Sequence, residues 1–493
     1  MMNFLKRLTF SSKFYKHSTV IRSLCNLNNF GENDYNFHEL LTPDPEYDAL
    51  RRNYIVDGRK AHSVLVCQPY IRFPTDIDDK PKSTPQLQLK ESISLIHSIP
   101  KWRVSDAGLF GVNDFHKPLF FSEKTVEEID GRIKGSSTTG LFIAADRLLG
   151  KQQYELENVL KVPVFDRYSI ILEIFKNHAT SAEAQIQLGL AEILYLKSRV
   201  NQYAPEVRGD KYSTGKTAGG SGMTARQRYR KLLESRTKVL KKASEKLEAN
   251  KERLRLRRKE LQYPIVSVIG YTNSGKTSLI KALSQDGKLS PEDRLFATLE
   301  VTAHPVKLPS LRKVLFLDSV GFIANIPKEL IDSFNVTFKE VANSDLLLHI
   351  YDASHPDLAN QKFTVLKTLD YLKFNPNLVS SMINVANKID LIDDSSSENS
   401  TAIEEGDIPV SVTEGQNLKS LIEKIDTKLT QVTGQQIVKV KVPNGGEELS
   451  WLHRETTIQS IEPDADANFL IVRATMNDVQ RKRFVAYFRR GKK

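Results

Sequence analysis

Residues 263–277 read YPIVSVIGYTNSGKT, and this stretch decides the fold. β-branched residues dominate 265–269, which is typical of a buried strand. Residues 270–277 then fit G-x-x-x-x-G-K-[ST], and apolar residues at helical spacing follow. Such a loop lets backbone N–H groups surround a phosphate at the start of a helix. The sequence therefore predicts a P-loop between a strand and a helix, in a domain that binds a nucleoside triphosphate.

The P-loop residues are expected to divide the work of holding that nucleotide. Lys276 would reach the β- and γ-phosphates, and the Thr277 hydroxyl would bind Mg²⁺. The remaining residues would offer backbone N–H groups. The predicted binding residues of this loop are Gly270, Tyr271, Thr272, Asn273, Ser274, Gly275, Lys276 and Thr277.

Two further segments are predicted to meet the phosphates. Thr298, in a polar stretch, has a hydroxyl and an N–H that can sense Mg²⁺ and the γ-phosphate. Residues 311–317 read as a strand that ends at Asp318, which can hold Mg²⁺ through water, and Gly321 can offer its N–H to the γ-phosphate. Predicted metal ligands are Thr277 and Thr298, and predicted catalytic residues are Lys276, Thr298 and Gly321. Predicted nucleotide contacts here are Phe296, Ala297, Thr298, Leu299, Asp318, Ser319, Val320 and Gly321.

A fourth segment predicts which base is bound. A strand at 382–386 leads into Asn387-Lys-Ile-Asp390. The Asp390 carboxylate can accept hydrogen bonds from guanine N1–H and the 2-amino group, which adenine lacks, so adenine would leave it unpaired. A last strand, 408–412, brings backbone N–H groups to guanine O6. The predicted base contacts are Asn387, Lys388, Ile389, Asp390, Ser411, Val412 and Thr413.

These segments follow one another in order, each at the carboxyl end of a predicted strand. That order predicts a mostly parallel, doubly wound α/β sheet over 263–430 that binds GTP with Mg²⁺. Phe322 stands where Ras-like switches carry the Gln that orients the attacking water. An apolar side chain cannot orient water, so we expect GTP hydrolysis that is slow alone and accelerated by a partner.

Length and composition limit the number of domains, the compartment and the kinds of partner that the chain can have. Its 493 residues exceed one core, and two to four domains are expected. No run of about eighteen apolar residues offers a membrane span. Two cysteines, Cys25 and Cys67, give no disulfide framework or metal cluster, which favours a reducing compartment. The net charge of +11 indicates a polyanionic partner.

The first segment, 1–31, is rich in Lys, Arg, Ser and Thr and has no acidic residue before Glu32. Interspersed apolar residues allow a basic amphipathic helix, which is typical of a mitochondrial presequence. The alternative is an ordinary basic tail. We expect import into the mitochondrial matrix.

Residues 45–165 predict a second α/β module. Strands are expected at 62–68 and 140–145, and helices at 125–133 and 152–160, which gives a small parallel sheet covered by helices. No cluster of catalytic residue types is present in this module.

Residues 166–260 predict a basic helical hairpin. Helical spacing runs from Ile170 to about Val200, a loop rich in Gly, Ser, Thr and Lys covers 203–223, and 224–260 has no Gly or Pro. Leucines recur every seven residues in that last stretch, as in a helix that packs on one partner helix. From Arg226 to Glu260 it holds fifteen Lys/Arg and five Glu, a surplus of ten positive charges. We expect this face to bind phosphate backbone without reading bases; the alternative is a solvated face.

With these features, the chain resembles the HflX family of translational GTPases, as a mitochondrial member. The matching runs are GYTNSGKTSL (270–279), FATLE (296–300), DSVGFI (318–323), NKID (387–390) and DRYSIILEIFKNHATSAEAQIQLGLAEILY (166–195). The resemblance implies binding to the large subunit of the mitochondrial ribosome and its rRNA, a GTPase that the ribosome stimulates, and separation of ribosomal subunits. It implies no DNA partner and a monomer away from the ribosome.

Residues 437–493 predict a small α+β domain with strands near 438–442 and 468–473 and a basic end. Two other functions stay open. One is a GTP-dependent assembly factor of the mitoribosomal large subunit, and the other is an rRNA-binding scaffold gated by nucleotide.

Overall fold

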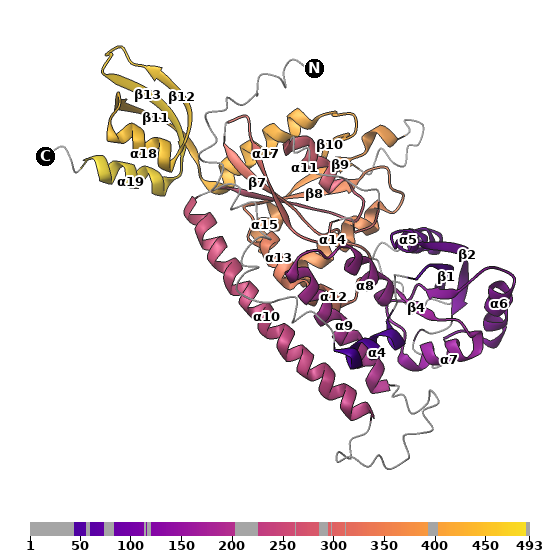
Figure 1. The fold of residues 1–493 in the computed structure, drawn as a ribbon. Helices are drawn as coiled ribbons and strands as arrows, with labels where there is room; N and C mark the ends of the chain where they lie inside the picture. The colour runs from indigo at the N-terminus through magenta and orange to yellow at the C-terminus, as the bar shows by residue number, and fades with distance from the viewer. Residues whose placement is uncertain are drawn as a thin grey trace.

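The computed structural model describes residues 44–55, 60–72, 83–112, 115, 120–202, 225–261, 263–284, 294–296, 298–310, 312–392 and 403–489. The predicted presequence 1–31, the predicted loop 203–223 and Ala297 lie outside them. Figure 1 shows the three sheets of the described chain, with a long helix running beside the central one.

The first sheet is parallel, as expected, with strand order β2-β1-β3-β4. Strand β1 reads HSVLVCQPYI and is buried over most of its length, because helices cover both faces of a parallel sheet. Its strands are β1 (His62–Ile71), β2 (Trp102–Val112), β3 (Gly140–Ile143) and β4 (Val164–Asp166). Its helices are α4 (Pro45–Tyr54), α5 (Pro85–His97), α6 (Glu123–Lys134) and α7 (Gly150–Leu160).

A buried ion pair joins this sheet to the helices that follow. Asp166, at the end of β4, accepts a hydrogen bond of 2.6 Å from Arg199, and both side chains are about 1% exposed. Arg199 also donates to the Leu148 carbonyl, and Tyr195 donates to Asp166. Removing one partner of such a pair leaves a buried charge, which costs about 3–5 kcal/mol. The helices and the first sheet are therefore firmly connected.

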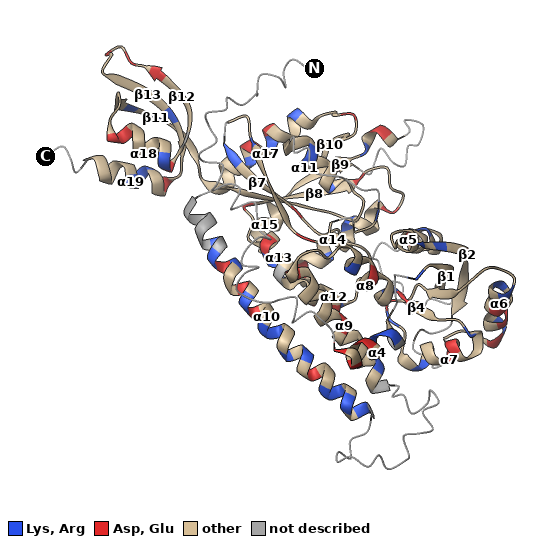
Figure 2. Ribbon diagram, viewed as in Figure 1, with Lys and Arg blue, Asp and Glu red and all other residues tan. Residues whose placement is uncertain are grey.

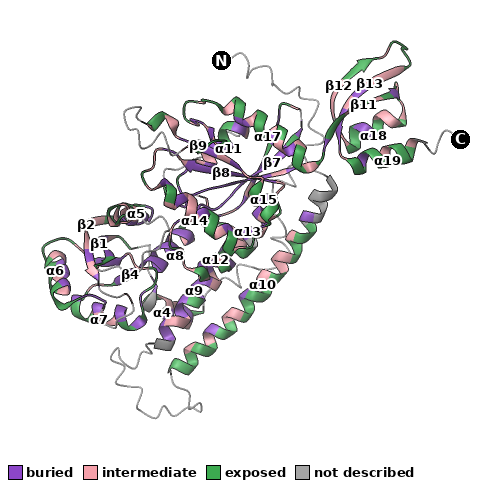
Figure 3. Ribbon diagram, turned by 180° about the vertical axis from the view of Figure 1, so that it is seen from behind, coloured by how far each residue is buried: buried purple, intermediate pink, exposed green. Residues whose placement is uncertain are grey.

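The helical hairpin consists of α9 (Ala182–Gln202) and α10 (Ala225–Leu261), preceded by α8 (Arg167–His178). The leucine stripe packs as predicted at Leu233 and Leu240, which are buried, while Leu247 is partly buried. Gly189 of α9 allows this approach, since a Cβ there would lie 2.8 Å from the Leu240 side chain. Figure 3 shows exposed residues recurring along α10.

The helical spacing over this stretch is divided between two helices. Helical spacing continues from Ile170 to Val200, yet the helix ends at His178 and a second one starts at Ala182. The backbone of Ala179 is extended, with φ −78° and ψ 102°, and the N–H groups of Thr180 and Ser181 bond to a side chain far along the chain. A tertiary contact therefore replaces the local helical bonds.

The central sheet has strand order β10-β9-β8-β5-β7-β6, and only β6 runs antiparallel in it. This is the mostly parallel doubly wound sheet that the sequence predicts. The last strand is shorter than the predicted 408–412, and β6 was not predicted. The strands are β5 (Ile265–Ile269), β6 (Thr302–Lys307), β7 (Lys313–Asp318), β8 (Leu346–Asp352), β9 (Ile383–Asn387) and β10 (Ile408–Pro409). The helices are α11 (Lys276–Ser284), α12 (Lys328–Ser333), α13 (Asn335–Ala342), α14 (Leu358–Tyr371), α15 (Pro376–Ser380), η4 (Ile389–Leu391) and α17 (Leu418–Thr433).

The third sheet is antiparallel, with order β11-β13-β12, and two helices pack on it. Its elements are β11 (Gln436–Pro443), α18 (Glu447–Glu455), β12 (Thr457–Pro463), β13 (Phe469–Met476) and α19 (Asp478–Arg489). This is the α+β arrangement that the sequence predicts for the end of the chain. None of the helices in the described part of the chain is long and apolar enough to span a membrane.

Candidate nucleotide-binding site

The P-loop lies between β5 and α11, at the carboxyl edge of the central sheet. Gly275 has φ +95°, and a Cβ at this position would lie 2.3 Å from the Asn387 amide. Only glycine tolerates both conditions, so the second glycine of the motif is fixed by geometry. Lys276 is buried, and its ammonium donates to the Tyr271 carbonyl at 2.7 Å and to the Gly270 carbonyl at 3.3 Å. The loop is therefore closed around the lysine that would meet the phosphates.

Burial also changes the charge of that lysine. It lowers the pKa of Lys276 from 10.5 to about 8, while the carboxylate of Asp318 acts in the opposite direction. Desolvation disfavours the charged form of a buried amine, and a nearby anion restores it. A bound triphosphate would add negative charge at this point and raise the pKa of Lys276 again.

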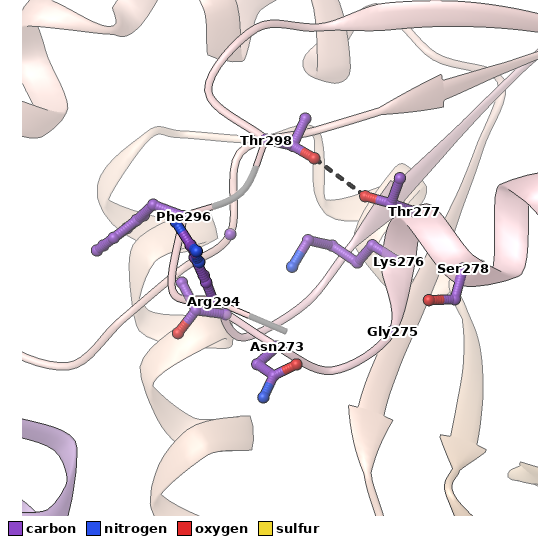
Figure 4. A pocket seen from close by; sticks show the side chains of 10 residues that line it. Asn273, Gly275, Lys276, Thr277, Ser278, Arg294, Phe296 and Thr298 are labelled. Carbon is purple, nitrogen blue, oxygen red and sulfur yellow. Dashed lines mark hydrogen bonds between the residues drawn. The ribbon is translucent and has the colours of Figure 1, made fainter. Parts of the chain in front are cut away.

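Three oxygen-bearing side chains converge beside the lysine. Thr277 donates to Asp318 Oδ2 at 2.7 Å, the hydroxyls of Thr277 and Thr298 lie 3.0 Å apart, and Thr298 donates to Asp318 Oδ2 at 3.3 Å. Figure 4 shows the Thr277 and Thr298 side chains facing each other, with the Lys276 side chain beside them. The structure thus brings together residues from three segments that the sequence proposed for Mg²⁺.

This cluster fits a hard cation. Magnesium prefers oxygen ligands, and the cluster offers two hydroxyls and a carboxylate. The second oxygen of that carboxylate, Asp318 Oδ1, is buried without a hydrogen-bond partner, and burial raises the pKa of Asp318. An unpaired buried carboxylate oxygen is costly, and a cation with its water shell would relieve that cost.

Gly321 lies so close to the P-loop that a side chain would not fit. A Cβ there would lie 2.8 Å from Thr272 Cγ2 and 3.0 Å from Lys276 Nζ. Phe322 next to it is held on both sides of its backbone, since its N–H donates to Gly270 and its carbonyl accepts from Thr272. Its ring is buried and stacks on Phe338 at 5.7 Å. The structure therefore places this apolar ring in the core, as a residue that orients no water.

At the end of the site predicted to bind the base, the Asn387 side chain connects two loops by hydrogen bonds. Its amide donates to the Ser274 carbonyl at 2.9 Å, and its Oδ1 accepts from the Val412 N–H at 3.2 Å. Lys388 pairs with Asp352 at 2.8 Å, and the carboxylate-bearing Asp390 is exposed in η4. Ser411 is buried and accepts from the Glu414 N–H, while Thr413 is exposed. This places the P-loop, β9 and the loop after β10 side by side.

The pocket at the P-loop is formed by the phosphate half of the predicted site. Its lining includes predicted residues from the P-loop and from both later phosphate segments, together with Ser278 and Arg294. Those two were not predicted, because a serine after a P-loop and an arginine in a polar stretch carry no motif. The lining residues are Thr272, Asn273, Gly275, Lys276, Thr277, Ser278, Arg294, Phe296, Thr298 and Gly321. Leu299 and Val320 are buried in the apolar core beside it, and Ser319 is buried and donates to the Val268 carbonyl.

A phosphate loop on a parallel sheet, an oxygen cluster beside it and an Asn-Lys-x-Asp segment at the next edge define a P-loop GTPase. Family models agree: residues 265–388 match "50S ribosome-binding GTPase", and residues 86–176 match "GTP-binding GTPase N-terminal". The chain is 37% identical over 404 residues to "Putative GTP-binding protein 6" of Xenopus laevis, which covers 82% of this chain and 75% of that protein.

Two other relatives extend the comparison. "GTPase HflX" of Caldanaerobacter subterraneus is 33% identical over 365 residues, covering 74% of this chain and 81% of that protein. "GTP-binding protein At3g49725, chloroplastic" of Arabidopsis thaliana is 31% identical over 389 residues, covering 69% and 60%. The chain belongs to the HflX family of GTPases, and it is a GTP-hydrolysing enzyme.

Proposed function

We propose that this GTPase binds the large subunit of the mitochondrial ribosome through its basic hairpin and separates the ribosomal subunits in its GTP state. The observation that carries the proposal is the recurrence of Lys and Arg along α10, a helix that packs against the GTPase domain. The family model named for 50S ribosome binding supports the choice of partner.

Some bases of α10 hold the hairpin to the rest of the molecule. Arg236 lies 4.5 Å over the Tyr47 ring, Lys251 pairs with Glu183, and Arg255 pairs with the buried Glu340. The bases of α10 whose side chains are exposed form the proposed binding surface, and Figure 2 shows Lys and Arg recurring along this helix with acidic residues among them. These bases are Arg226, Arg228, Arg230, Lys231, Lys238, Lys241, Lys242 and Arg253. Their spacing along one rod suits the phosphates of a folded RNA more than a compact ligand.

In the proposed reaction, the P-loop amides and Lys276 hold the β- and γ-phosphates. Thr277, Thr298 and Asp318 would hold Mg²⁺, which would supply positive charge against the charge that develops on the phosphates. Gly321 offers its N–H to the γ-phosphate, and Asp390 selects guanine. Phe322 supplies no hydrogen bond to the attacking water, so the ribosome either supplies a group that orients it or rearranges the segment around Gly321.

The compartment is proposed from residues 1–31, whose composition is that of a presequence. The name of the Arabidopsis relative also places that protein in an organelle. Residues 1–31 fused to a fluorescent protein should direct it to the mitochondrial matrix, and a diffuse cytosolic signal would remove this part of the proposal.

The test of the proposed function is light scattering by intact mitochondrial ribosomes. Adding the full chain with a non-hydrolysable GTP analogue should lower the scattering as subunits separate, whereas GDP should not. Binding to immature large subunits without any separation would favour the assembly function. Binding that ignores the nucleotide would favour the scaffold.

Charge-reversal variants distinguish binding of the subunit by the hairpin from an effect of the net charge of the protein. Lys238→Glu with Lys241→Glu and Lys242→Glu should weaken subunit binding on the order of tenfold or more at physiological salt, because several phosphate contacts are lost. A matched control is Lys124→Glu with Lys367→Glu and Lys373→Glu, which reverses exposed charges outside the hairpin. Equal losses in both triple variants would show that net charge, and not the hairpin, binds the subunit.

A further inference from the structure

The segment that carries Thr298 is attached to the helices before the GTPase domain. The carboxylate of Glu300 accepts hydrogen bonds from the Thr180 N–H at 2.8 Å, the Thr180 hydroxyl at 3.1 Å and the Ser181 N–H at 2.6 Å. These donors stand directly before the first turn of α9. Charged acceptors form the stronger hydrogen bonds, and the amino end of a helix favours a negative charge.

A second attachment lies on the other side of Thr298. Phe296 is buried, and its ring meets Phe175 of α8 edge-on at 4.7 Å. Phe296 also has φ +58°, a conformation that residues other than glycine adopt only when the surroundings impose it. Phe175 in turn packs on Phe334 at 5.1 Å. The core around α8 therefore fixes a strained residue two positions before Thr298.

Helix α8 reaches the opposite side of the phosphate site as well. Its first residue, Arg167, donates to the Ala324 carbonyl at 2.9 Å and pairs with Glu91 of α5. The Tyr271 hydroxyl of the P-loop donates to Glu91 at 2.5 Å and accepts from the Ala324 N–H at 2.7 Å. Both segments that flank the γ-phosphate position thus contact α8 or the turn before α9.

We propose that Glu300 is a positioning residue for GTP hydrolysis, which holds the Thr298 hydroxyl in the metal site by anchoring its segment to the start of α9. The anchor removes part of the conformational entropy that Mg²⁺·GTP binding would otherwise have to overcome. Because α9 is one arm of the hairpin, a shift of the hairpin changes the position of Thr298. The same contact therefore transmits nucleotide state to the hairpin, and binding at the hairpin to the nucleotide.

The two roles of such a contact can be separated. If Glu300 only joins two parts of the molecule, its loss lowers stability and changes no ligand requirement. If it positions Thr298, its loss raises the Mg²⁺ concentration needed for hydrolysis and weakens binding of GTP more than binding of GDP, because GDP lacks the γ-phosphate that Thr298 meets.

The experiment uses the full chain and GTP alone, without ribosomes. Glu300→Ala should raise the Mg²⁺ concentration for half-maximal hydrolysis about tenfold, because Mg²⁺ binding must then also overcome the conformational entropy of the freed segment. The variant should also have a lower ratio of GTP affinity to GDP affinity. Glu300→Gln keeps an accepting oxygen and should recover most of both effects. Thr180 lies 120 residues from Glu300 in the sequence. Thr180→Val removes the hydroxyl, which is one of the three donors to Glu300, and should change both quantities in the same direction by a smaller amount.

Glu248→Ala is the matched control. Glu248 of α10 pairs with Lys339 of α13, so the variant loses a carboxylate contact between the hairpin and the GTPase domain that involves neither α9 nor the segment of Thr298. It should leave the Mg²⁺ requirement and the affinity ratio unchanged. The proposal is overturned if Glu300→Ala lowers the melting temperature while both quantities stay at wild-type values, or if Glu248→Ala changes them equally. Because no ribosome is present, failure here leaves the proposed ribosomal function untouched.

Discussion

The guanine end of the nucleotide site is held by residues of its own domain, whereas the phosphate end is held partly by helices that precede the domain. Asn387 ties the P-loop to the loop after β10, and Lys388 pairs with Asp352. Glu300 and Ala324, by contrast, contact Thr180, Ser181 and Arg167. From this difference we expect base recognition to be local, and the groups around the predicted γ-phosphate position to be coupled to the hairpin.

The largest effect is expected at Lys276. Lys276→Ala removes the cation that would stabilise charge on the transferring phosphoryl group, so the rate of GTP hydrolysis should fall about 10²–10³-fold. Single-turnover hydrolysis with radiolabelled GTP measures the change. A rate within a few-fold of wild type would contradict the role given to Lys276 and, with it, the phosphate end of the comparison.

Asp390 tests the guanine end. Asp390→Asn replaces an acceptor by a donor opposite guanine N1–H, and GTP affinity should fall on the order of 10²-fold. Hydrolysis at saturating GTP and its Mg²⁺ requirement should stay unchanged, since this end is local. Xanthosine triphosphate, which has an oxygen in place of the 2-amino group, should bind the variant better than GTP does. A changed Mg²⁺ requirement in this variant would contradict the expectation that base recognition is independent of the phosphate end.

Thr298 tests the metal cluster directly. Thr298→Ala removes one hydroxyl from the set around Asp318, so the Mg²⁺ concentration for half-maximal hydrolysis should rise about tenfold, the equivalent of one hydrogen bond to a charged group. Binding of GDP should change little. Thr413→Ala, at the guanine end, is the control and should leave the Mg²⁺ requirement at its wild-type value.

The smallest effect concerns pH. The pKa of Lys276 is about 8 in the folded chain and 10.5 in the unfolded one. The unfolded chain binds this proton more tightly than the folded one, so protonation of Lys276 favours unfolding. The part of the free energy of unfolding that depends on Lys276 is therefore fully present above pH 10.5 and is lost as the pH falls through 8. Bound phosphates raise the pKa again, so nucleotide binding near pH 8 should take up a fraction of a proton, which calorimetry in buffers of different ionisation enthalpy measures. Release of protons on nucleotide binding would contradict the lowered pKa of Lys276 in the nucleotide-free protein.

The places of the P-loop and of the Asn387–Asp390 segment at the sheet edge could be predicted, because each is a short contiguous motif that follows a strand. Residues 270–277 lie in one turn, and Asn387 and Asp390 are three residues apart. The strand and helix patterns around them are equally local, which is why the central sheet and the hairpin were predicted. The antiparallel β6 was missed, since it is a short segment that contains one histidine and one proline and has no clear alternation of apolar and polar residues.

The contacts at the phosphate end could not be predicted in this way. Glu300 meets Ser181 across 119 residues, and Arg167 meets Ala324 across 157. A glutamate in a loop and an arginine at a helix start are ordinary surface residues in a sequence. Apolar residues keep helical spacing through the break between α8 and α9. The Ser181 hydroxyl, which accepts from the Ala184 N–H, marks the start of α9 locally, whereas the contact with Glu300 cannot be read from the sequence.

The most direct test of the central claim is the affinity of the full chain for purified mitochondrial large subunits in two nucleotide states. If hairpin and phosphate end are coupled, a non-hydrolysable GTP analogue should tighten binding relative to GDP by at least about fivefold, the lower range of coupling between two sites. By linkage, the subunit should raise the affinity for the GTP analogue relative to that for GDP by the same factor. Equal affinities in the two states, with tight binding in both, would contradict the account.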